Sequence, residues 1–139
     1  MIPLEKIMVL NKVPLFSALH SDDLYAISTI AQEEAHEQGH ILFHQGDIGD
    51  SLFIIVTGAV RILKDNQHTL ATLHENDFLG DLALFGSETR TATAKCEGSC
   101  LFLVISRDDI EQLAHEYPAI LFGFIKVLNQ RLREMIAQQ

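Results

Sequence analysis

The apolar positions of this chain change their period twice, which divides it into three segments. Residues 1–33 carry apolar side chains at helical spacing, and we expect two short amphipathic helices there, separated near Pro14. Residues 34–105 alternate apolar and polar positions with a period of two, which is typical of β-strands. Residues 106–139 return to the helical period, so the pattern predicts two further helices on either side of Pro118.

Local signals place some helix ends more closely. Ser21 precedes two aspartates and is expected to cap the second helix, which should run to about Ala31. Ser106 is followed three residues later by Asp109, which is similar to a capping box with the shorter acid. We therefore expect the third helix to begin directly after Ser106.

The final helix, from Ala119 to about Ala137, is predicted to keep a continuous apolar face. The residues of this face are Leu121, Phe124, Ile125, Leu128, Leu132, Met135 and Ile136. Such a face suits packing against a neighbouring helix or against a second copy of the chain. A homodimer through the C-terminal helix is therefore one expected assembly.

Seven short strands are expected in the central segment. They are Glu34–Glu37, Ile41–His44, Leu52–Val56, Ala59–Leu63, Thr69–Leu73, Arg90–Cys96 and Cys100–Ile105. Turn residues separate them, and Gly58 and Gly98 are two of the expected strand breakers. Many short strands with glycine-rich turns are typical of an antiparallel jelly roll or barrel. The whole chain, residues 1–139, is thus interpreted as one α+β domain.

Composition and charge limit the class of protein and partner. With 139 residues and 47% hydrophobic residues, the chain can bury a core as a single domain. No apolar run reaches the roughly 18 residues of a membrane span, and the first residues lack the apolar block of a signal peptide. We therefore expect a cytoplasmic protein. The formal net charge of −9 opposes binding to nucleic acid or to an anionic membrane.

The stretch Phe78–Ala94 carries the best candidate for binding chemistry. Gly80 can adopt backbone angles closed to other residues and lets a ligand approach the main chain. Asp81 then begins a short segment with helical spacing, whose first amides could bind an anion. Arg90 is the only Lys or Arg between Lys64 and Lys95. The stretch therefore predicts a site where backbone amides and one arginine bind a single anionic group.

This stretch resembles the phosphate-binding cassette of cyclic nucleotide-binding domains, whose pattern is roughly F-x-G-E-x-A-L followed by R-[ST/A]-A. The matching residues are Phe78, Gly80, Asp81, Ala83 and Leu84, then Arg90, Thr91 and Ala92. A second stretch upstream resembles the glycine pattern of the family's β-roll. Its residues are Gly39, Ile41, Phe43, Gly46, Asp47, Gly49, Asp50, Ser51, Leu52 and Phe53, then Gly58 and Val60. The resemblance extends from about residue 13 to residue 136.

The resemblance implies a fold and a ligand. The fold would be an eight-stranded antiparallel β-roll (a double-stranded β-helix, or jelly roll) over residues 34–105, with the cassette at 78–94. N-terminal helices (1–33) and C-terminal lid helices (106–139) would flank it. The ligand would be cAMP or cGMP, with no other cofactor. The domain would act as a sensor that relays ligand occupancy through its C-terminal helix.

The resemblance also implies roles for single residues. The phosphate would be held by Arg90 and by backbone amides near Leu82 and Ala83, with Gly80 and Ala92 completing the motif. Asp81 would accept a hydrogen bond from the ribose 2′-hydroxyl, and Thr91 would reach the phosphate or a guanine base. Arg131 and Met135 would cover the purine. The site residues that the resemblance implies are therefore Gly80, Asp81, Leu82, Ala83, Arg90, Thr91, Ala92, Arg131 and Met135.

One residue departs from the family pattern. The family's ribose-binding glutamate is replaced by Asp81, which is one methylene shorter. A hydrogen bond to a charged group contributes roughly 1.5–3 kcal/mol, although a bridging water could recover much of it. The replacement motivates an alternative hypothesis: a degenerate roll that acts as a nucleotide-independent docking or dimerisation module.

Other chemically active residues support weaker hypotheses. His36, His40 and His44 recur every four residues, which on a helix would suggest a metal site, but the surrounding alternation favours strand–turn–strand. A metal-dependent jelly-roll enzyme is therefore a rival hypothesis, although the H-x-H pair of cupins is missing. Cys96 and Cys100 are interpreted as two reduced strand cysteines that face each other across a hairpin, and a redox pair is the alternative. We find no nucleophile with a matching base, so neither an enzyme nor a metal site is expected.

Overall fold

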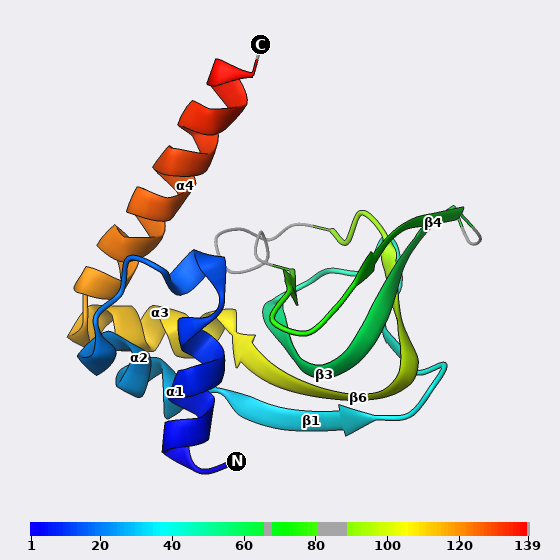
Figure 1. Cartoon of the computed structure of the whole chain (residues 1–139), viewed down its shortest axis with the longest axis horizontal. Helices are drawn as coiled ribbons and strands as arrows, with labels where there is room; N and C mark the ends of the chain where they lie inside the picture. The colour runs from blue at the N-terminus through cyan, green and yellow to red at the C-terminus, as the bar shows by residue number, and fades with distance from the viewer. Residues whose placement is uncertain (66–67, 81–88, 139) are drawn as a thin grey trace. The chain divides into compact units, whose positions relative to one another are not determined.

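The computed structural model describes residues 1–65, 68–80 and 89–138 of the chain (Figure 1). Its backbone contacts group into two compact units. One unit is helical and contains residues 1–30 and 110–139. The other contains residues 31–109, which hold the strands. The mixed helix-and-sheet class therefore agrees with the predicted α+β class.

The helical unit contains the helices predicted from the apolar period. They are α1 (Pro3–Asn11), the 3-10 turn η1 (Pro14–Phe16), α2 (Ser21–Ser28), α3 (Arg107–Glu116, of which 110–116 belong to this unit) and α4 (Ala119–Ala137). Phe16 and Phe124 are buried, with their ring centroids 5.6 Å apart. A Cβ at Gly123 would collide with Cδ2 of Leu19, so the end of the Leu19 side chain packs directly against this glycine.

The ends of α2 differ from the prediction at both sides. Ser21 is the first helical residue rather than the cap. The backbone N–H of His20 donates instead to the carboxylate of Asp23, at 3.3 Å. The helix ends at Ser28 because two hydroxyls bond back to last-turn carbonyls: Ser28 to Tyr25 at 2.5 Å and Thr29 to Ala26 at 2.6 Å. At the start of α3, one bond of the predicted capping box is present, since the N–H of Asp109 donates to Ser106 Oγ at 3.2 Å.

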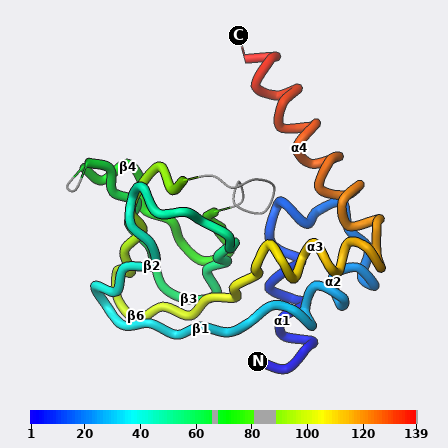
Figure 2. The backbone as a smooth tube through the Cα atoms, turned by 180° about the vertical axis from the view of Figure 1, so that it is seen from behind, coloured from blue at the N-terminus to red at the C-terminus, as the bar shows by residue number. Residues whose placement is uncertain are grey.

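The strands of the second unit form one antiparallel sheet. They are β1 (Gln32–His36), β2 (Ile41–Phe43), β3 (Ser51–Lys64), β4 (His68–Leu73), β5 (Phe78–Leu79) and β6 (Thr93–Ser106). The order is β1-β6-β3-β4, and in addition β2 pairs with β6 and β5 pairs with β3. Figures 1 and 2 show the long strands β3 and β6 curving side by side. The described residues therefore contain six strands, where eight were expected from the resemblance.

Two of the expected strand breakers lie inside continuous strands. Gly58 was predicted to separate two strands, but both belong to β3, and Gly98 likewise lies within β6. Both glycines have positive φ, +99° and +79°, and the β3–β6 register shifts on each side of Thr57. These are features of β-bulges, in which an extra residue bends a strand without ending it. A Cβ at Gly58 would also lie only 2.7 Å from Cys100 Sγ.

The core of this unit is a cluster of apolar side chains from the curved sheet. Its buried members are Phe53, Ile55, Val60, Leu79, Ala94, Cys96, Cys100, Phe102 and Val104. Cys96 and Cys100 are free thiols on one continuous strand, not on opposite arms of a hairpin. Burial, with a smaller contribution from Cys100, raises the pKa of Cys96 to about 12. The Cys96 thiol is therefore protonated and unreactive near neutral pH.

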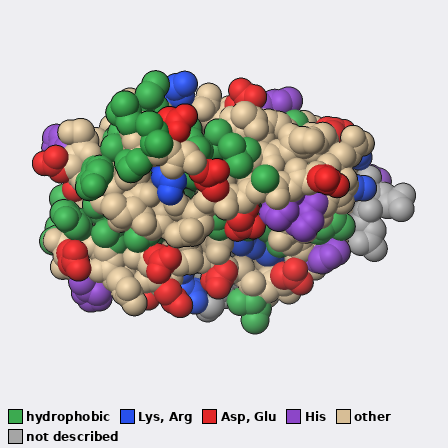
Figure 3. Space-filling model, turned by 90° about the horizontal axis from the view of Figure 1, so that it is seen from below, with side chains coloured by type: hydrophobic (Ala, Val, Ile, Leu, Met, Phe, Trp, Pro, Cys, Tyr) green, Lys and Arg blue, Asp and Glu red, His purple; other side chains and the backbone are tan. Residues whose placement is uncertain are grey.

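The surface reflects the negative net charge of the chain. Figure 3 shows one face on which Asp and Glu side chains are spread among neutral residues, with fewer Lys and Arg. In the described part of the chain, no helix has the length and apolar character needed to cross a bilayer. On such an acidic surface, the groups around a cation decide whether its charge is compensated.

Candidate functional site

The structure brings together two of the residues predicted for the binding site. Gly80 follows β5, and Arg90 lies shortly before β6. A Cβ at Gly80 would collide with Nη1 of Arg90, so the guanidinium lies directly against this glycine. Gly80 has φ +87°, the left-handed conformation that favours glycine. The guanidinium of Arg90 therefore contacts the backbone at Gly80, near the start of the predicted cassette.

The outcome is not the same for all of the remaining predicted site residues. Asp81, Leu82 and Ala83 lie outside the described residues. Arg131 and Met135 lie on α4 in the helical unit, and their role at the base stays a prediction. Thr91 is exposed and Ala92 is buried. Both precede β6, which begins at Thr93 and not at Arg90 as predicted.

The backbone of Arg90 is held by the turn at residues 46–47. The N–H of Gly46 donates to the carbonyl of Arg90 at 2.8 Å, and the N–H of Arg90 donates to the carbonyl of Asp47 at 2.6 Å. The carboxylate of Asp47 closes this turn by accepting from the N–H of His44 at 2.9 Å. An isolated bridge between Ile48 and Thr89 continues the pairing. The glycine motif of the roll therefore positions the arginine.

The guanidinium of Arg90 is enclosed on several sides. Nη2 donates to the carbonyl of Ser51 at 2.9 Å. The guanidinium carbon lies 4.1 Å from the centroid of the Phe43 ring. A Cβ at Gly49 would collide with Nε and Cζ. The Nε atom is buried and has no hydrogen-bond partner within the described residues.

The electrostatic surroundings leave this cation incompletely compensated. Burial lowers the pKa of Arg90, while the charges of Asp50 and Asp47 oppose that shift. Neither aspartate forms an ion pair with Arg90 among the residues that the structure describes. A buried donor without a partner is unfavourable, and an anionic oxygen would be its strongest partner. The arrangement is therefore suited to binding an anion.

Sequence reasoning missed three contributors to this arrangement. Phe43, Gly49 and Ser51 were part of the glycine pattern, but no role at the arginine was predicted for them. A strand residue in an alternating pattern is normally assigned to the core, and Phe43 does pack against the core cluster. Its second contact, with Arg90, becomes evident only in the folded structure, where two segments that are distant in the sequence lie close together.

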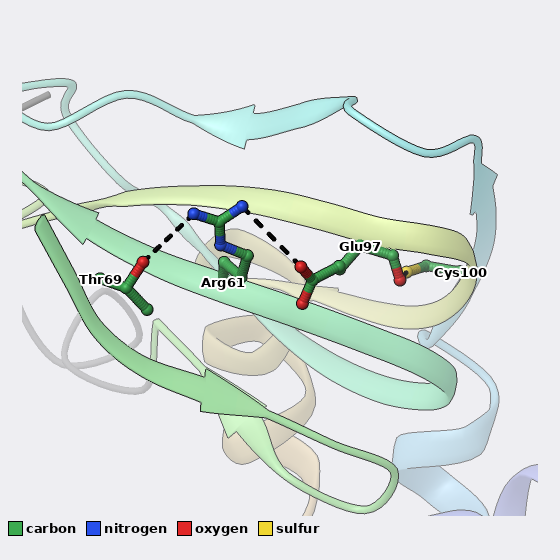
Figure 4. A network of polar contacts seen from close by, with 4 residues as sticks. All are labelled: Arg61, Thr69, Glu97 and Cys100. Atoms are coloured by element: carbon green, nitrogen blue, oxygen red, sulfur yellow. Dashed lines mark hydrogen bonds and ion pairs between the residues drawn. The ribbon is translucent and has the colours of Figure 1, made fainter. Parts of the chain in front are cut away.

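A second arginine of the same unit has a different environment. Arg61, on β3, donates from Nη2 to Thr69 Oγ1 at 3.2 Å, and its Nη1 lies 3.8 Å from Glu97 Oε1 (Figure 4). Glu97 is on β6, and its carbonyl lies 4.0 Å from Cys100 Sγ. Arg61 therefore links three strands and already has a carboxylate partner.

The histidines lie on strand–turn–strand, as the sequence predicted, and not in a helical register. His36 ends β1 and His40 precedes β2, as expected for strand–turn–strand. Their rings stack with centroids 3.9 Å apart, and His36 Nε2 lies 3.1 Å from Glu34 Oε1. Among the described residues, no group of three or more His, Cys, Asp or Glu side chains could hold a metal ion. The histidine spacing thus carries no metal site in this part of the chain.

Sequence comparison places the site within a known family. Residues 33–117 match the cyclic nucleotide-binding domain. The chain is 38% identical over 113 residues to the cGMP-dependent protein kinase, isozyme 2 forms cD5/T2, of Drosophila melanogaster, covering 75% of this chain and 12% of the kinase. It is 28% identical over 125 residues to the cyclic AMP receptor protein of Thermus thermophilus, covering 87% of this chain and 58% of that protein. The chain thus spans less than two thirds of either relative.

Solved structures share the fold. The N-terminal domain of a transcriptional regulator from Streptomyces coelicolor A3(2) has a TM-score of 0.86 at 26% identity, covering 94% of each chain. The regulatory domain of Toxoplasma gondii PKA with cAMP has a TM-score of 0.73 at 25% identity, covering 80% of this chain and 44% of that one. The regulatory subunit of a cAMP-independent protein kinase A from Trypanosoma brucei has the same score and identity, covering 80% and 41%. The fold is therefore similar both to a regulatory domain solved with cAMP and to the regulatory subunit of a cAMP-independent kinase.

Proposed function

Because this chain belongs to the cyclic nucleotide-binding domain family, we propose that it binds cAMP or cGMP and acts as a regulatory sensor domain. The observation that carries the proposal is the state of Arg90. Its guanidinium lies against Gly80, and its buried Nε has no partner within the described residues. A cyclic phosphate supplies the charged oxygens that such a group requires.

The proposed binding mode assigns one task to each part of the ligand. Arg90 binds the phosphate, and the backbone amides of Leu82 and Ala83 complete its shell. Asp81 accepts from the ribose 2′-hydroxyl, while Thr91 reaches the phosphate or a guanine base. Neutralising one negative group with one arginine and neutral amides also explains how a chain of net charge −9 captures an anion.

The proposed signal is a change in the final helix. Arg131 and Met135 would cover the purine, so that ligand binding favours one position of α4 over others. A ligand shifts a conformational equilibrium only by its difference in affinity for the two states. We propose no catalysis by this domain and a cytoplasmic location, and the kinase activity named for the Drosophila relative belongs to that protein.

Titration calorimetry with cAMP and with cGMP tests the proposal. We expect saturable binding of at least one nucleotide by the wild-type chain and none by Arg90→Ala. Arg61→Ala is the matched control, because Arg61 belongs to the same unit but has its own partners. No heat of binding up to millimolar nucleotide would contradict the proposal. Equal affinities for the wild type and for Arg90→Ala would remove Arg90 from the site.

A nucleotide-independent docking or dimerisation module is the second candidate function. The exposed side of α4 favours it, since apolar residues recur there in alternating steps of four and three, as in a coiled coil. These residues are Leu121, Ile125, Leu128, Leu132 and Met135, which are 37–63% exposed. The substitution at Asp81 and the cAMP-independent relative point the same way.

Oligomeric state measured by light scattering tests this second function. We expect the wild-type chain to form a dimer without nucleotide and Leu128→Glu to be a monomer. Gln130→Glu changes a residue outside this apolar series and serves as the control. A monomeric wild-type chain at high micromolar concentration would exclude dimerisation through α4.

A further inference from the structure

Four residues enclose the guanidinium of Arg90, and we call them the arginine socket: Phe43, Gly49, Ser51 and Gly80. They come from β2, from the loop before β3, from the start of β3 and from the end of β5. Ser51 contributes a backbone carbonyl, and the glycines contribute the absence of a side chain. Phe43 is therefore the only one of the four whose side chain contacts the guanidinium.

The contact with Phe43 has the geometry of a cation–π interaction. Its ring centroid is 4.1 Å from the guanidinium carbon, within the roughly 6 Å range of such contacts. The same ring packs against Phe53, with centroids 5.9 Å apart at 44°. Phe53 is a buried member of the core cluster. Phe43 thus connects a rigid core to a charged group at the site.

Gly49 limits where the guanidinium can lie. A Cβ at this position would collide with Nε and Cζ of Arg90, the two atoms nearest the branching point of the charge. Unlike Gly80, Gly49 is not in the left-handed region, so alanine is compatible with its backbone. Substitution of Gly49 by alanine therefore changes the space around Arg90 without adding backbone strain.

The socket surrounds each nitrogen of the Arg90 guanidinium differently. Nη2 is bound to the carbonyl of Ser51, and Nη1 faces Gly80. Nε is buried without a partner among the described residues. A guanidinium that is confined before the ligand arrives loses little freedom when it binds. Pre-organisation of this kind needs walls on the sides that the ligand does not occupy.

We propose that Phe43 and Gly49 are positioning residues, which hold the Arg90 guanidinium in the orientation in which it binds the ligand's phosphate. This inference rests on the proposed function for the identity of the ligand. The orientation of the arginine itself belongs to the protein alone. It can therefore be measured without any nucleotide.

The first experiment measures the Nε–Hε signal of Arg90 by NMR in the protein alone, assigned by its loss in Arg90→Lys. A buried and confined Hε exchanges slowly with water. We expect a sharp signal in the wild type, in Phe43→Tyr and in the control Phe102→Leu. Phe102→Leu removes a ring from the same core without a recorded contact to Phe43 or Arg90. The signal should broaden or disappear in Phe43→Leu and in Gly49→Ala.

The second experiment measures cAMP and cGMP affinity in the same variants, with urea unfolding as a check on the fold. Phe43→Leu should weaken binding by about 5- to 30-fold, as expected for loss of a partly desolvated cation–π contact. Phe43→Tyr keeps the aromatic ring and should bind like the wild type, and Phe102→Leu should remain within about threefold of the wild type. Gly49→Ala should weaken binding by at least about tenfold.

The outcomes separate the two proposals. A sharp Hε signal in a wild-type chain that binds neither nucleotide contradicts the proposed function and supports the socket. Sharp signals and wild-type affinity in both Phe43→Leu and Gly49→Ala overturn the socket. If Phe43→Leu does not fold, Gly49→Ala alone decides, because its backbone tolerates alanine.

Discussion

Arg61 and Arg90 belong to the same β-unit and carry the same charge, yet their surroundings differ in every respect that matters for binding. Arg61 is 37% exposed at its side chain and lies 3.8 Å from the carboxylate of Glu97. Arg90 stacks on Phe43, has no carboxylate partner within the described residues, and has a buried Nε without any partner there. The exposed arginine has a carboxylate partner in the sheet, whereas the enclosed arginine without one is the residue that we propose binds an anion.

The fold explains why Arg61 and Arg90 have different surroundings. The strand pairing β6–β3–β4 brings Thr69 and Glu97 to either side of Arg61. Arg90 lies outside a regular strand, and its backbone bonds to the turn at residues 46–47. A residue in a ladder finds partners on neighbouring strands. A residue at a loop can instead be directed toward a ligand.

The largest expected effect is the loss of nucleotide binding in Arg90→Ala. The cation that contacts the phosphate is removed together with its charge-assisted hydrogen bonding, so affinity should fall by about 100-fold or more. Arg61→Ala should change affinity by less than about twofold. Calorimetry on both variants measures the contrast. If the two variants bind equally well, the environments of the two arginines do not determine which of them binds ligand.

A smaller effect is expected at Asp81, which sharpens the comparison by testing the ribose contact separately from the phosphate contact. Asp81→Glu restores the family's side-chain length and should tighten binding, by about tenfold at most. Asp81→Asn retains the length and removes the charge, so it should weaken binding. Weaker binding by Asp81→Glu would mean that the site is shaped around the shorter acid.

The pH dependence of stability adds to this comparison a buried group without charge, the thiol of Cys96. Burial raises the pKa of Cys96 to about 12, above the ordinary value near 8.5 in an unfolded chain. The contribution of this thiol to stability is therefore complete below about pH 8.5 and is lost as the pH rises toward 12. Urea unfolding at pH 8, 9.5 and 10.5 should show a steeper alkaline loss in the wild type than in Cys96→Ala. Parallel curves for the two proteins would contradict the assignment.

The smallest effect concerns the stability contribution of Arg61. Its ion pair with Glu97 is exposed at both side chains, and such pairs contribute about 0–1 kcal/mol. Arg61→Ala should therefore lower the free energy of unfolding by no more than about 1 kcal/mol, and less at 1 M salt. Chemical denaturation at two salt concentrations measures this. A larger, salt-independent loss would show that Arg61 has a structural role beyond the ion pair.

Much of the fold was predictable because it depends on local patterns. The final helix begins at Ala119 and ends at Ala137, as its apolar period and Pro118 indicated. The left-handed backbone at Gly80 was likewise expected from the residue type. The end of α2 was less predictable, because the hydroxyls of Ser28 and Thr29 compete for carbonyls of the last turn. The spacing of the apolar residues gives no information about that competition.

The sequence by itself determined the class of the fold, the two glycine motifs and the choice of Arg90 as the one cation of its stretch. Tertiary structure decided that Gly58 and Gly98 bend long strands instead of ending them, because a bulge depends on the register of the partner strand. It also decided the partners of Arg90. Ser51 lies 39 positions away in the chain and Phe43 still farther, and contacts over such separations arise only when the strands pair.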